Sequence, residues 1–209
     1  MANDWTPPTP PGWDYRAPDP GPPKATQEQA APASKLAPVT IGAAGDLGPA
    51  KVKLLIQRVI QPALRENLPW TRNLLSEILR GAPGGTNGHD KRGLALRVFE
   101  FVRYRLRYVN DPTGREMFTA LPVLWKRGLG DCDDFSALLA ALLMAAGIKV
   151  KLRVIRTPKA GGWSHIYPMA WLPGRGNTPP EWRALDATVS APAGWEATRA
   201  DLFDTEVTP

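Results

Sequence analysis

The sequence predicts an α+β fold in which helices come first along the chain and an antiparallel sheet follows. Apolar residues recur at helical spacing from about residue 47 to Gly147, and after Gly147 the apolar period shifts to two, as in strands. The single cysteine, Cys132, stands at the start of the most apolar of the predicted helices. We therefore expect a helical half and a sheet half that share one core of about 150 residues.

Residues 1–46 are predicted to lie outside that core. They contain ten of the 23 prolines, with aromatic residues scattered among them and no apolar period of any length. Such a segment buries too little surface to offset the entropy lost on ordering, which favours a disordered tail. The alternative interpretation is an extended arm whose prolines and aromatic side chains dock into a groove on another protein.

Residues 47–92 are predicted to form a helical cover on the core, followed by a loop. One helix with an apolar face runs to about Gln61, where Pro62 bends or ends it. A second helical pattern spans residues 70–79. The loop that follows is rich in Gly, Pro and Asn and contains His89, which we expect to be solvated.

Residues 93–190 are predicted to form the core domain. It begins with an amphipathic helix over residues 93–109, whose apolar side chains face inward and whose arginines lie largely outside. A short helix over residues 122–126 follows, and Thr119 is a suitable cap for it. The chain then reaches the cysteine helix.

The cysteine helix is predicted to carry the chemistry at its N-terminus. Asp131 is a good N-cap and Gly147 a good stop, so Cys132 falls in the first helical turn. The N–H groups and the positive dipole end of that turn favour a thiolate, which is the form of cysteine that attacks carbonyl groups. The negative charges of Asp131, Asp133 and Asp134 oppose it. We therefore expect a nearby imidazole to assist.

Beyond Gly147 the sequence predicts three antiparallel strands. They span residues 150–155, 163–172 and 182–189, with a Gly-Gly hairpin turn between the first two. Pro168 inside the second strand indicates an edge position or a nearby bulge. The tail over residues 191–209 is expected to lie along the surface.

A histidine and an aspartate on these strands complete a candidate catalytic group. His165 shares one strand face with the alternate residues from 163 to 171. If that face packs on the cysteine helix, His165 can act as a base toward Cys132. Asp186, on the following strand, can then hold the other ring nitrogen and stabilise the imidazolium.

The residues that would bind the reacting carbonyl are less evident from the sequence. The backbone N–H of Cys132 at the helix start is a natural oxyanion donor. The second donor is not visible in the sequence, and Trp125 is the candidate side chain. Trp163 and Asp131 are further candidates for substrate or oxyanion binding.

Three blocks of the sequence resemble a known family. The transglutaminase-like cysteine-enzyme superfamily, which has a papain-like core, is similar to this chain in GDCDDFSALLAALLMAAGIKVKLRVI, SHIYPMAW and WRALDATV. The resemblance implies that Cys132 is the nucleophile, His165 the base and Asp186 its orienting acid. It also implies a papain/transglutaminase-like fold, with the cysteine at a helix N-terminus packed on the antiparallel sheet. The run RYRLRYVNDPTGREMFTALPVLWKRGLGDCDD is most similar to phage- and prophage-encoded members.

The resemblance and the residues leave three functions open. The first is a cysteine hydrolase of the peptidase or amidase type, acting on a protein or peptide through an acyl-enzyme. The second is a transglutaminase-type acyl transferase, in which an amine takes the place of water. The third is a virion or assembly protein that keeps the fold and binds phage structural proteins through its N-terminal arm.

Composition limits the partners and the cellular location that we expect. The net charge of +6 comes without a lysine-rich block or nucleic-acid motif, so nucleic acid is not the expected partner. The longest apolar run, within residues 135–148, is shorter than the ~20 residues of a membrane span. One cysteine and no secretory signal predict synthesis in the bacterial cytoplasm, with virion association as a further possibility. We expect no cofactor, and no metal site, since adjacent side chains on a helix diverge.

Overall fold

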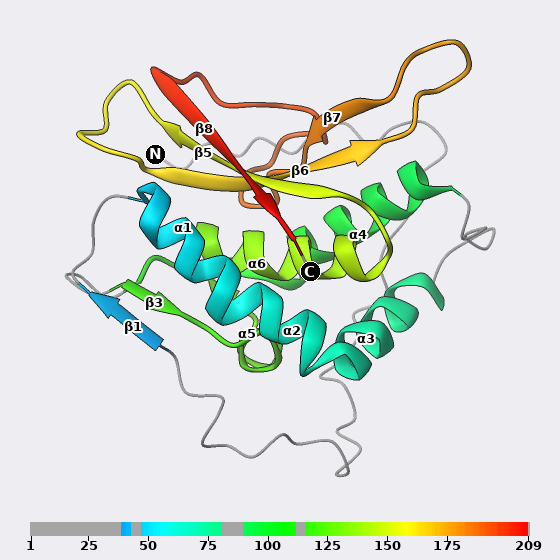
Figure 1. Ribbon diagram of the computed structural model, residues 1–209, viewed down its shortest axis with the longest axis horizontal. Helices are drawn as coiled ribbons and strands as arrows, with labels where there is room; N and C mark the ends of the chain where they lie inside the picture. Colours follow the sequence, from blue (N-terminus) through cyan, green and yellow to red (C-terminus); the bar gives the residue numbers. More distant parts are fainter. Residues whose placement is uncertain (1–38, 43–46, 81–89, 112–115, 209) are drawn as a thin grey trace.

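The computed structural model describes residues 39–42, 47–80, 90–111 and 116–208 (Figure 1). Most of the predicted arm, residues 1–38, lies outside the described residues, and so does His89. Within the described ranges, helices and an antiparallel sheet form two layers, as the sequence predicted.

A four-stranded antiparallel sheet forms one layer, with the strand order β7-β6-β5-β8 (Figure 1). The strands are β5 (Val150–Arg156), β6 (His165–Leu172), β7 (Glu181–Ala184) and β8 (Asp201–Val207). The predicted third strand is shorter than expected, because β7 ends at Ala184 and Asp186 lies two residues beyond it, directly before a turn. The main-chain oxygen of Pro168 accepts from Leu185 on the β7 side. Its missing N–H therefore falls where the β7 ladder stops.

Strand β8 corrects the expectation of a surface tail over residues 191–209. It pairs with β5 along its whole length, from Val150 with Val207 to Arg156 with Asp201. The sequence hides this strand because most of its side chains are exposed or half-buried, as on a sheet edge, and its apolar alternation is weak.

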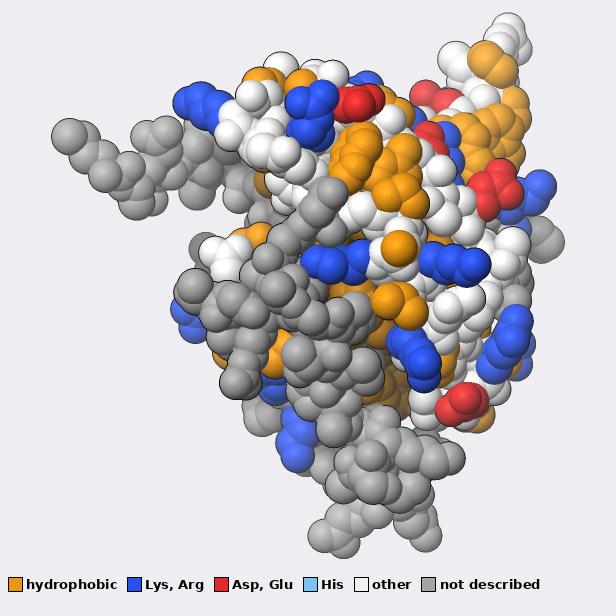
Figure 2. All heavy atoms as spheres, turned by 60° about the vertical axis from the view of Figure 1, so that its left-hand side comes forward, with side chains coloured by type: hydrophobic (Ala, Val, Ile, Leu, Met, Phe, Trp, Pro, Cys, Tyr) orange, Lys and Arg blue, Asp and Glu red, His pale blue; other side chains and the backbone are white. Residues whose placement is uncertain are grey.

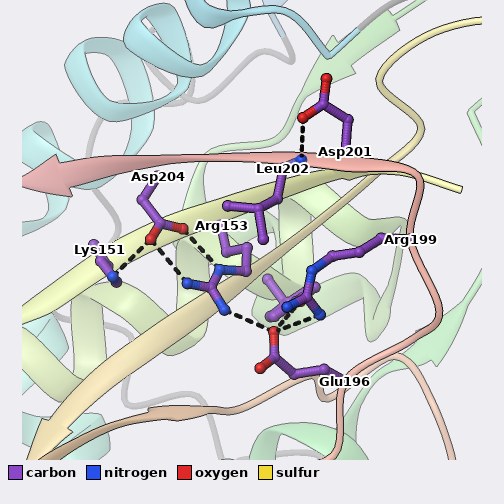
Figure 3. Close-up of polar contacts among 8 residues, drawn as sticks. Lys151, Arg153, Glu196, Arg199, Asp201, Leu202 and Asp204 are labelled. Atoms are coloured by element: carbon purple, nitrogen blue, oxygen red, sulfur yellow. Dashed lines mark hydrogen bonds and ion pairs between the residues drawn. The ribbon is translucent and has the colours of Figure 1, made fainter.

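Ion pairs on the outer face of the sheet connect β8 and the segment before it to β5 (Figure 3). Arg153 on β5 holds Asp204 with two hydrogen bonds of 2.8 and 2.9 Å and reaches Glu196 at 2.7 Å. Arg199 contacts the same carboxylate of Glu196, and Lys151 contacts Asp204. The C-terminal segment is therefore part of the folded unit.

The second layer consists of helices on the other face of the sheet (Figure 1). Helix α6 (Cys132–Ala145) lies at its centre, and every residue from Cys132 to Leu143 is buried. The surrounding elements are α1 (Pro49–Leu55), the π-helical η2 (Ile56–Ile60), α2 (Gln61–Arg65), α3 (Leu68–Arg80), α4 (Lys91–Arg105) and α5 (Leu121–Arg127). A helix that is apolar on all sides needs neighbours on all sides, and α6 has them.

Pro62 does not end the first helix. The chain continues without a break from α1 through η2 into α2, and Pro62 occupies the first turn of α2. The N–H of Gln61 donates to Ile56, a π-type hydrogen bond. This wider turn directly before the proline accommodates a residue that can donate no hydrogen bond of its own.

The helix predicted over residues 93–109 ends earlier in the structure. Helix α4 stops at Arg105, and residues 107–108 form strand β2, parallel to β4 (Leu129–Gly130). The N–H groups of Arg107 and Val109 donate to Gly128 and Gly130, at 2.9 Å each. These long-range hydrogen bonds replace the helical ones.

A further short ladder joins the end of the predicted arm to the core. Strand β1 (Val39–Gly42) pairs antiparallel with β3 (Glu116–Phe118). Residues 39–42 of the segment assigned to the arm are therefore extended and paired.

On one face of the molecule the basic side chains are dispersed. Figure 2 shows the side of β1 and the start of α1, where Lys and Arg side chains lie in several separate places among apolar and uncharged ones. In the described part of the chain, no helix is long and apolar enough to cross a membrane.

Candidate active site

The N-terminal turn of α6 is built as the sequence predicted. Asp131 is the N-cap, and its side chain accepts from the N–H of Asp134 at 3.5 Å, so Cys132 is the first helical residue. Gly130 precedes the cap because a Cβ there would lie 2.7 Å from the Asp134 side chain and 2.8 Å from Leu124. The Cys132 side chain is nearly buried, with 8% of the residue exposed.

Thr119 does not cap helix α5, in contrast to the prediction. The N-cap of α5 is Ala120, without a side-chain hydrogen bond, and the backbone N–H of Thr119 donates instead to Asp134 at 3.2 Å. Burial first, and the charge of Asp131 second, raise the pKa of Asp134 to about 8. The carboxyl group of Asp134 is therefore mostly protonated at neutral pH.

The three acids of this turn converge more than expected. Asp131, Asp133 and Asp134 are all buried, and their carboxylate oxygens lie within 4.8 Å of one another. The expectation that neighbouring side chains on a helix diverge is wrong for these three, because Asp131 precedes the helix and has extended backbone angles. Oxygen ligands of this kind suit hard cations such as Ca²⁺ and Mg²⁺.

His165 and Asp186 form a direct pair. Nε2 of His165, the first residue of β6, lies 2.7 Å from Oδ2 of Asp186. The other oxygen of Asp186 accepts from both the N–H and the hydroxyl of Thr188, at 3.1 and 2.6 Å. The carboxylate is buried at 4% exposure and fixed on both oxygens. Because Asp186 occupies Nε2 of His165, Nδ1 is the ring nitrogen that can bond to a further partner.

The strand face that carries His165 does not pack on the body of α6, which corrects one premise of the prediction. Tyr167 and Met169, on the His165 face, belong to a separate apolar cluster with Ile155 on the outer side of the sheet. The alternate residues Ile166 and Ala170 belong to the core that contains α6. The apolar period of two does not reveal which of two buried faces a helix covers.

A hydrogen bond nevertheless joins the first turns of α6 to the start of β6. The hydroxyl of Ser136, one turn after Cys132, donates to the main-chain oxygen of Ile166 at 3.0 Å. Ile166 follows His165 directly. The helix end that holds the thiol is therefore adjacent to the strand end that holds the imidazole.

The tentative tryptophans have contacts of other kinds. The Trp125 ring stacks on Phe101 of α4 at 5.6 Å, and the Arg105 guanidinium lies 4.7 Å from its centre. Trp163 precedes β6 and makes an edge contact with Phe203 of β8 at 4.7 Å. These contacts hold α5 and β8 in place. The oxyanion and substrate roles of both side chains stay predictions.

Tyr108 is the site residue that sequence reasoning missed. It was assigned to the end of a helix, whereas in β2 it pairs with Gly130, two residues before Cys132. Burial, followed by the charges of Cys132, Asp131, Asp133 and Asp186, raises the pKa of Tyr108 above its ordinary value. The phenol is therefore electrostatically coupled to both the helix and the turn that carry the candidate catalytic side chains.

A hollow elsewhere in the molecule does not coincide with these residues. It has a volume of about 610 Å³ and lies at the C-terminal end of α6, where Met144, Trp171 and Trp182 line it. None of the candidate catalytic side chains lines this hollow. We place the candidate active site by its chemistry, at the opposite end of the helix.

The family of the chain follows from its sequence match. A sequence profile described as the transglutaminase-like superfamily matches residues 82–187. The chain belongs to this superfamily. The matched region of this transglutaminase-like chain contains Cys132, His165 and Asp186. No curated protein gave a significant match to the sequence.

Solved structures of several proteins are similar to this chain at low sequence identity. A candidate cysteine protease from Cytophaga hutchinsonii is 17% identical, with a TM-score of 0.45 over 78% of this chain and 55% of the other. A candidate protease from Parabacteroides distasonis is 11% identical, with a TM-score of 0.45 over 77% and 30%. LapG of Legionella pneumophila is 14% identical, with a TM-score of 0.40 over 71% and 77%. The transglutaminase-like chain thus spans about half of the first protein and under a third of the second.

Proposed function

We propose that this protein is a cysteine hydrolase of the peptidase or amidase type. Cys132 is the nucleophile, His165 the general base and acid, and Asp186 the group that orients and stabilises the imidazole. Family membership and the helix-start position of Cys132 support the proposal.

The observation that carries the proposal is the hydrogen bond between His165 and Asp186. A buried carboxylate at 2.7 Å from Nε2 selects the tautomer with the proton on that nitrogen. Nδ1 is then an acceptor, which is what a base toward a thiol requires. Thr188 holds the other carboxylate oxygen, so the pair is oriented before substrate binds.

In the first half of the reaction the thiol proton moves to Nδ1 of His165. The sulfur of Cys132 then forms a bond to the substrate carbonyl carbon, and the carbonyl π electrons move to its oxygen. When this oxyanion collapses, the C–N bond breaks and the imidazolium returns its proton to the leaving amine. An acyl-enzyme thioester remains on Cys132.

Water completes the reaction. His165 takes a proton from the water as its oxygen attacks the thioester carbonyl, and the C–S bond breaks in the second collapse. The carboxylic acid product leaves and the sulfur regains a proton. If a primary amine attacks in place of water, the same residues perform acyl transfer, which is the alternative reaction we keep open.

The proposal is tested by incubating the full chain with a mixed peptide library, with and without a labelled primary amine. We expect new peptide termini in the wild type and none in Cys132→Ala or His165→Ala. Incorporation of the amine in preference to hydrolysis would favour acyl transfer. Cleavage that survives Cys132→Ala would contradict the assignment of the nucleophile.

A phage setting is a further part of the proposal, and it rests on sequence resemblance alone. In that setting the segment 1–38 would bind phage structural proteins, and the enzyme would be made in the bacterial cytoplasm and carried in the particle. Quantitative mass spectrometry of purified particles tests this. A fixed copy number in the particle supports the setting, and absence from it contradicts that part only.

A further inference from the structure

We propose that the hydroxyl of Tyr108 is the second oxyanion donor of the site, together with the backbone N–H of Cys132. This inference rests on the proposed function and adds a catalytic residue to it. The sequence left the second donor unassigned, with Trp125 as a guess. Four features of the structure lead to Tyr108 instead.

The first feature is the backbone position of Tyr108. Strand β2 runs parallel to β4, and Tyr108 is the partner of Gly130. Paired strands lie about 4.8 Å apart, so the Cα of Tyr108 is a close neighbour of the residue that leads into Asp131 and Cys132. The hydrogen bond from Val109 to Gly130, at 2.9 Å, fixes this register.

The second feature is the direction of the side chain. The ring of Tyr108 packs against Phe135, with 6.3 Å between the ring centres and an interplanar angle of 46°. Phe135 belongs to the first turn of α6, next to the position of Cys132. The half-exposed tyrosine side chain therefore extends along the helix end that holds the thiol.

The third feature is the electrostatic surroundings of the phenol. Burial and the negative charges of Cys132, Asp131, Asp133 and Asp186 disfavour the phenolate and raise its pKa. The group keeps its proton at every pH at which an enzyme of this kind works. A neutral O–H close to a thiolate can donate a hydrogen bond to an oxyanion that forms on the attacked carbon.

The fourth feature is the availability of the hydroxyl. The residue is 46% exposed, so substrate can reach it. The hydroxyl of Tyr167 donates to Glu196, but the hydroxyl of Tyr108 has no such acceptor among the residues that the structure describes. Donation to the oxyanion would give this O–H a partner only while the tetrahedral intermediate exists, and this is the condition for lowering a barrier.

The chemical role is limited to the addition step. As the bond from sulfur to the carbonyl carbon forms, the electron pair of the C=O moves to oxygen, and the O–H of Tyr108 and the N–H of Cys132 donate to that oxygen. No proton is transferred. When the C–N bond breaks, the carbonyl reforms and both hydrogen bonds weaken.

Two reactions of the same thiol separate this role from others. Acylation by p-nitrophenyl acetate passes through an oxyanion, whereas alkylation by iodoacetamide does not. We expect Tyr108→Phe to slow acylation of Cys132 by about 100-fold to 1,000-fold, the range for loss of an oxyanion donor. Alkylation should stay within about two-fold of wild type, because the thiol itself is unchanged.

Tyr104→Phe is the matched control, because Tyr104 is an exposed tyrosine on the neighbouring helix α4, at 70% exposure. It should leave both rates unchanged. Equal acylation in Tyr108→Phe and wild type would overturn the inference, and so would an equal loss of both reactions, which would mean that Tyr108 acts on the thiol. If the wild-type thiol is no faster than free cysteine in either reaction, the proposed function fails first.

Discussion

The two ends of helix α6 differ in what they bury. The N-terminal turn buries Asp131, Asp133, Asp134 and Cys132, and Tyr108 packs over it. The remainder of the helix buries only apolar side chains from Phe135 onward, apart from Ser136, and ends beside the hollow lined by Trp171 and Trp182. Burial of polar groups costs free energy, so a fold that needed only stability would not place them there. We propose that the chemistry is confined to the N-terminal end, where these polar groups lie.

The largest effect is expected at the carboxylate that orients the imidazole. Asp186→Asn should reduce the acylation rate of Cys132 by about 100-fold to 10,000-fold, because the amide stabilises the wrong tautomer of His165 and no longer offsets the imidazolium charge. Rapid-mixing measurement of p-nitrophenyl release tests this. A loss of less than about five-fold would show that the pair is structural.

A substitution in the apolar part of helix α6 should lower the stability of the protein and leave the reactivity of the Cys132 thiol unchanged. Leu139 is fully buried in α6. Leu139→Ala should lower the free energy of unfolding by about 2–5 kcal/mol, through lost burial and the cavity that remains. Urea denaturation measures this. If the folded variant also loses acylation by more than a few fold, the two parts of the helix are not separable.

Asp134 should make stability depend on pH. Its pKa in the folded state, about 8, lies above the value of about 3.9 for an unfolded aspartate. The folded state therefore retains the proton to higher pH, and its stability falls as pH rises between those two values. From about pH 6 to pH 8 the loss is on the order of 2 kcal/mol, and Asp134→Asn should remove it. The test is to measure the urea midpoints of the wild type and of Asp134→Asn across this pH range. If the stability of both proteins falls equally with pH, the raised pKa is not that of Asp134.

The smallest effect is expected at the other end of the helix. Trp171 lines the hollow, is 38% exposed and lies far along β6 from His165. Trp171→Ala should change peptide hydrolysis by less than about two-fold, since surface truncations away from a site are usually mild. A large rise in KM with kcat unchanged would mean that the hollow binds substrate.

The sequence predicted those features that depend on local chemistry. The N-cap, the stop at Gly147 and the two strands of the β5–β6 hairpin follow from capping preference, positive φ and apolar alternation. The candidate residues His165 and Asp186 were predicted from their positions on neighbouring strands and by resemblance, and their hydrogen bond agrees with that choice.

The features it missed depend on contacts between distant segments. Tyr108 extends the apolar pattern of α4, and only the hydrogen bonds of β2 with β4 place it beside Gly130. Strand β8 is recognised as a strand by its pairing with β5 and by Arg153, not by its own residues. The face of β6 that meets α6 was also beyond reach, because both faces are apolar.

The central claim is that the thiol of Cys132 and the ring of His165 act as a pair. The most direct test is the rate of iodoacetamide alkylation at about pH 6 relative to about pH 9, where a free cysteine thiol slows by roughly 200-fold on acidification. We predict a loss of less than about ten-fold in the wild type and the full loss in His165→Ala. A wild-type thiol that falls as steeply as free cysteine, with no change in His165→Ala, would contradict the account.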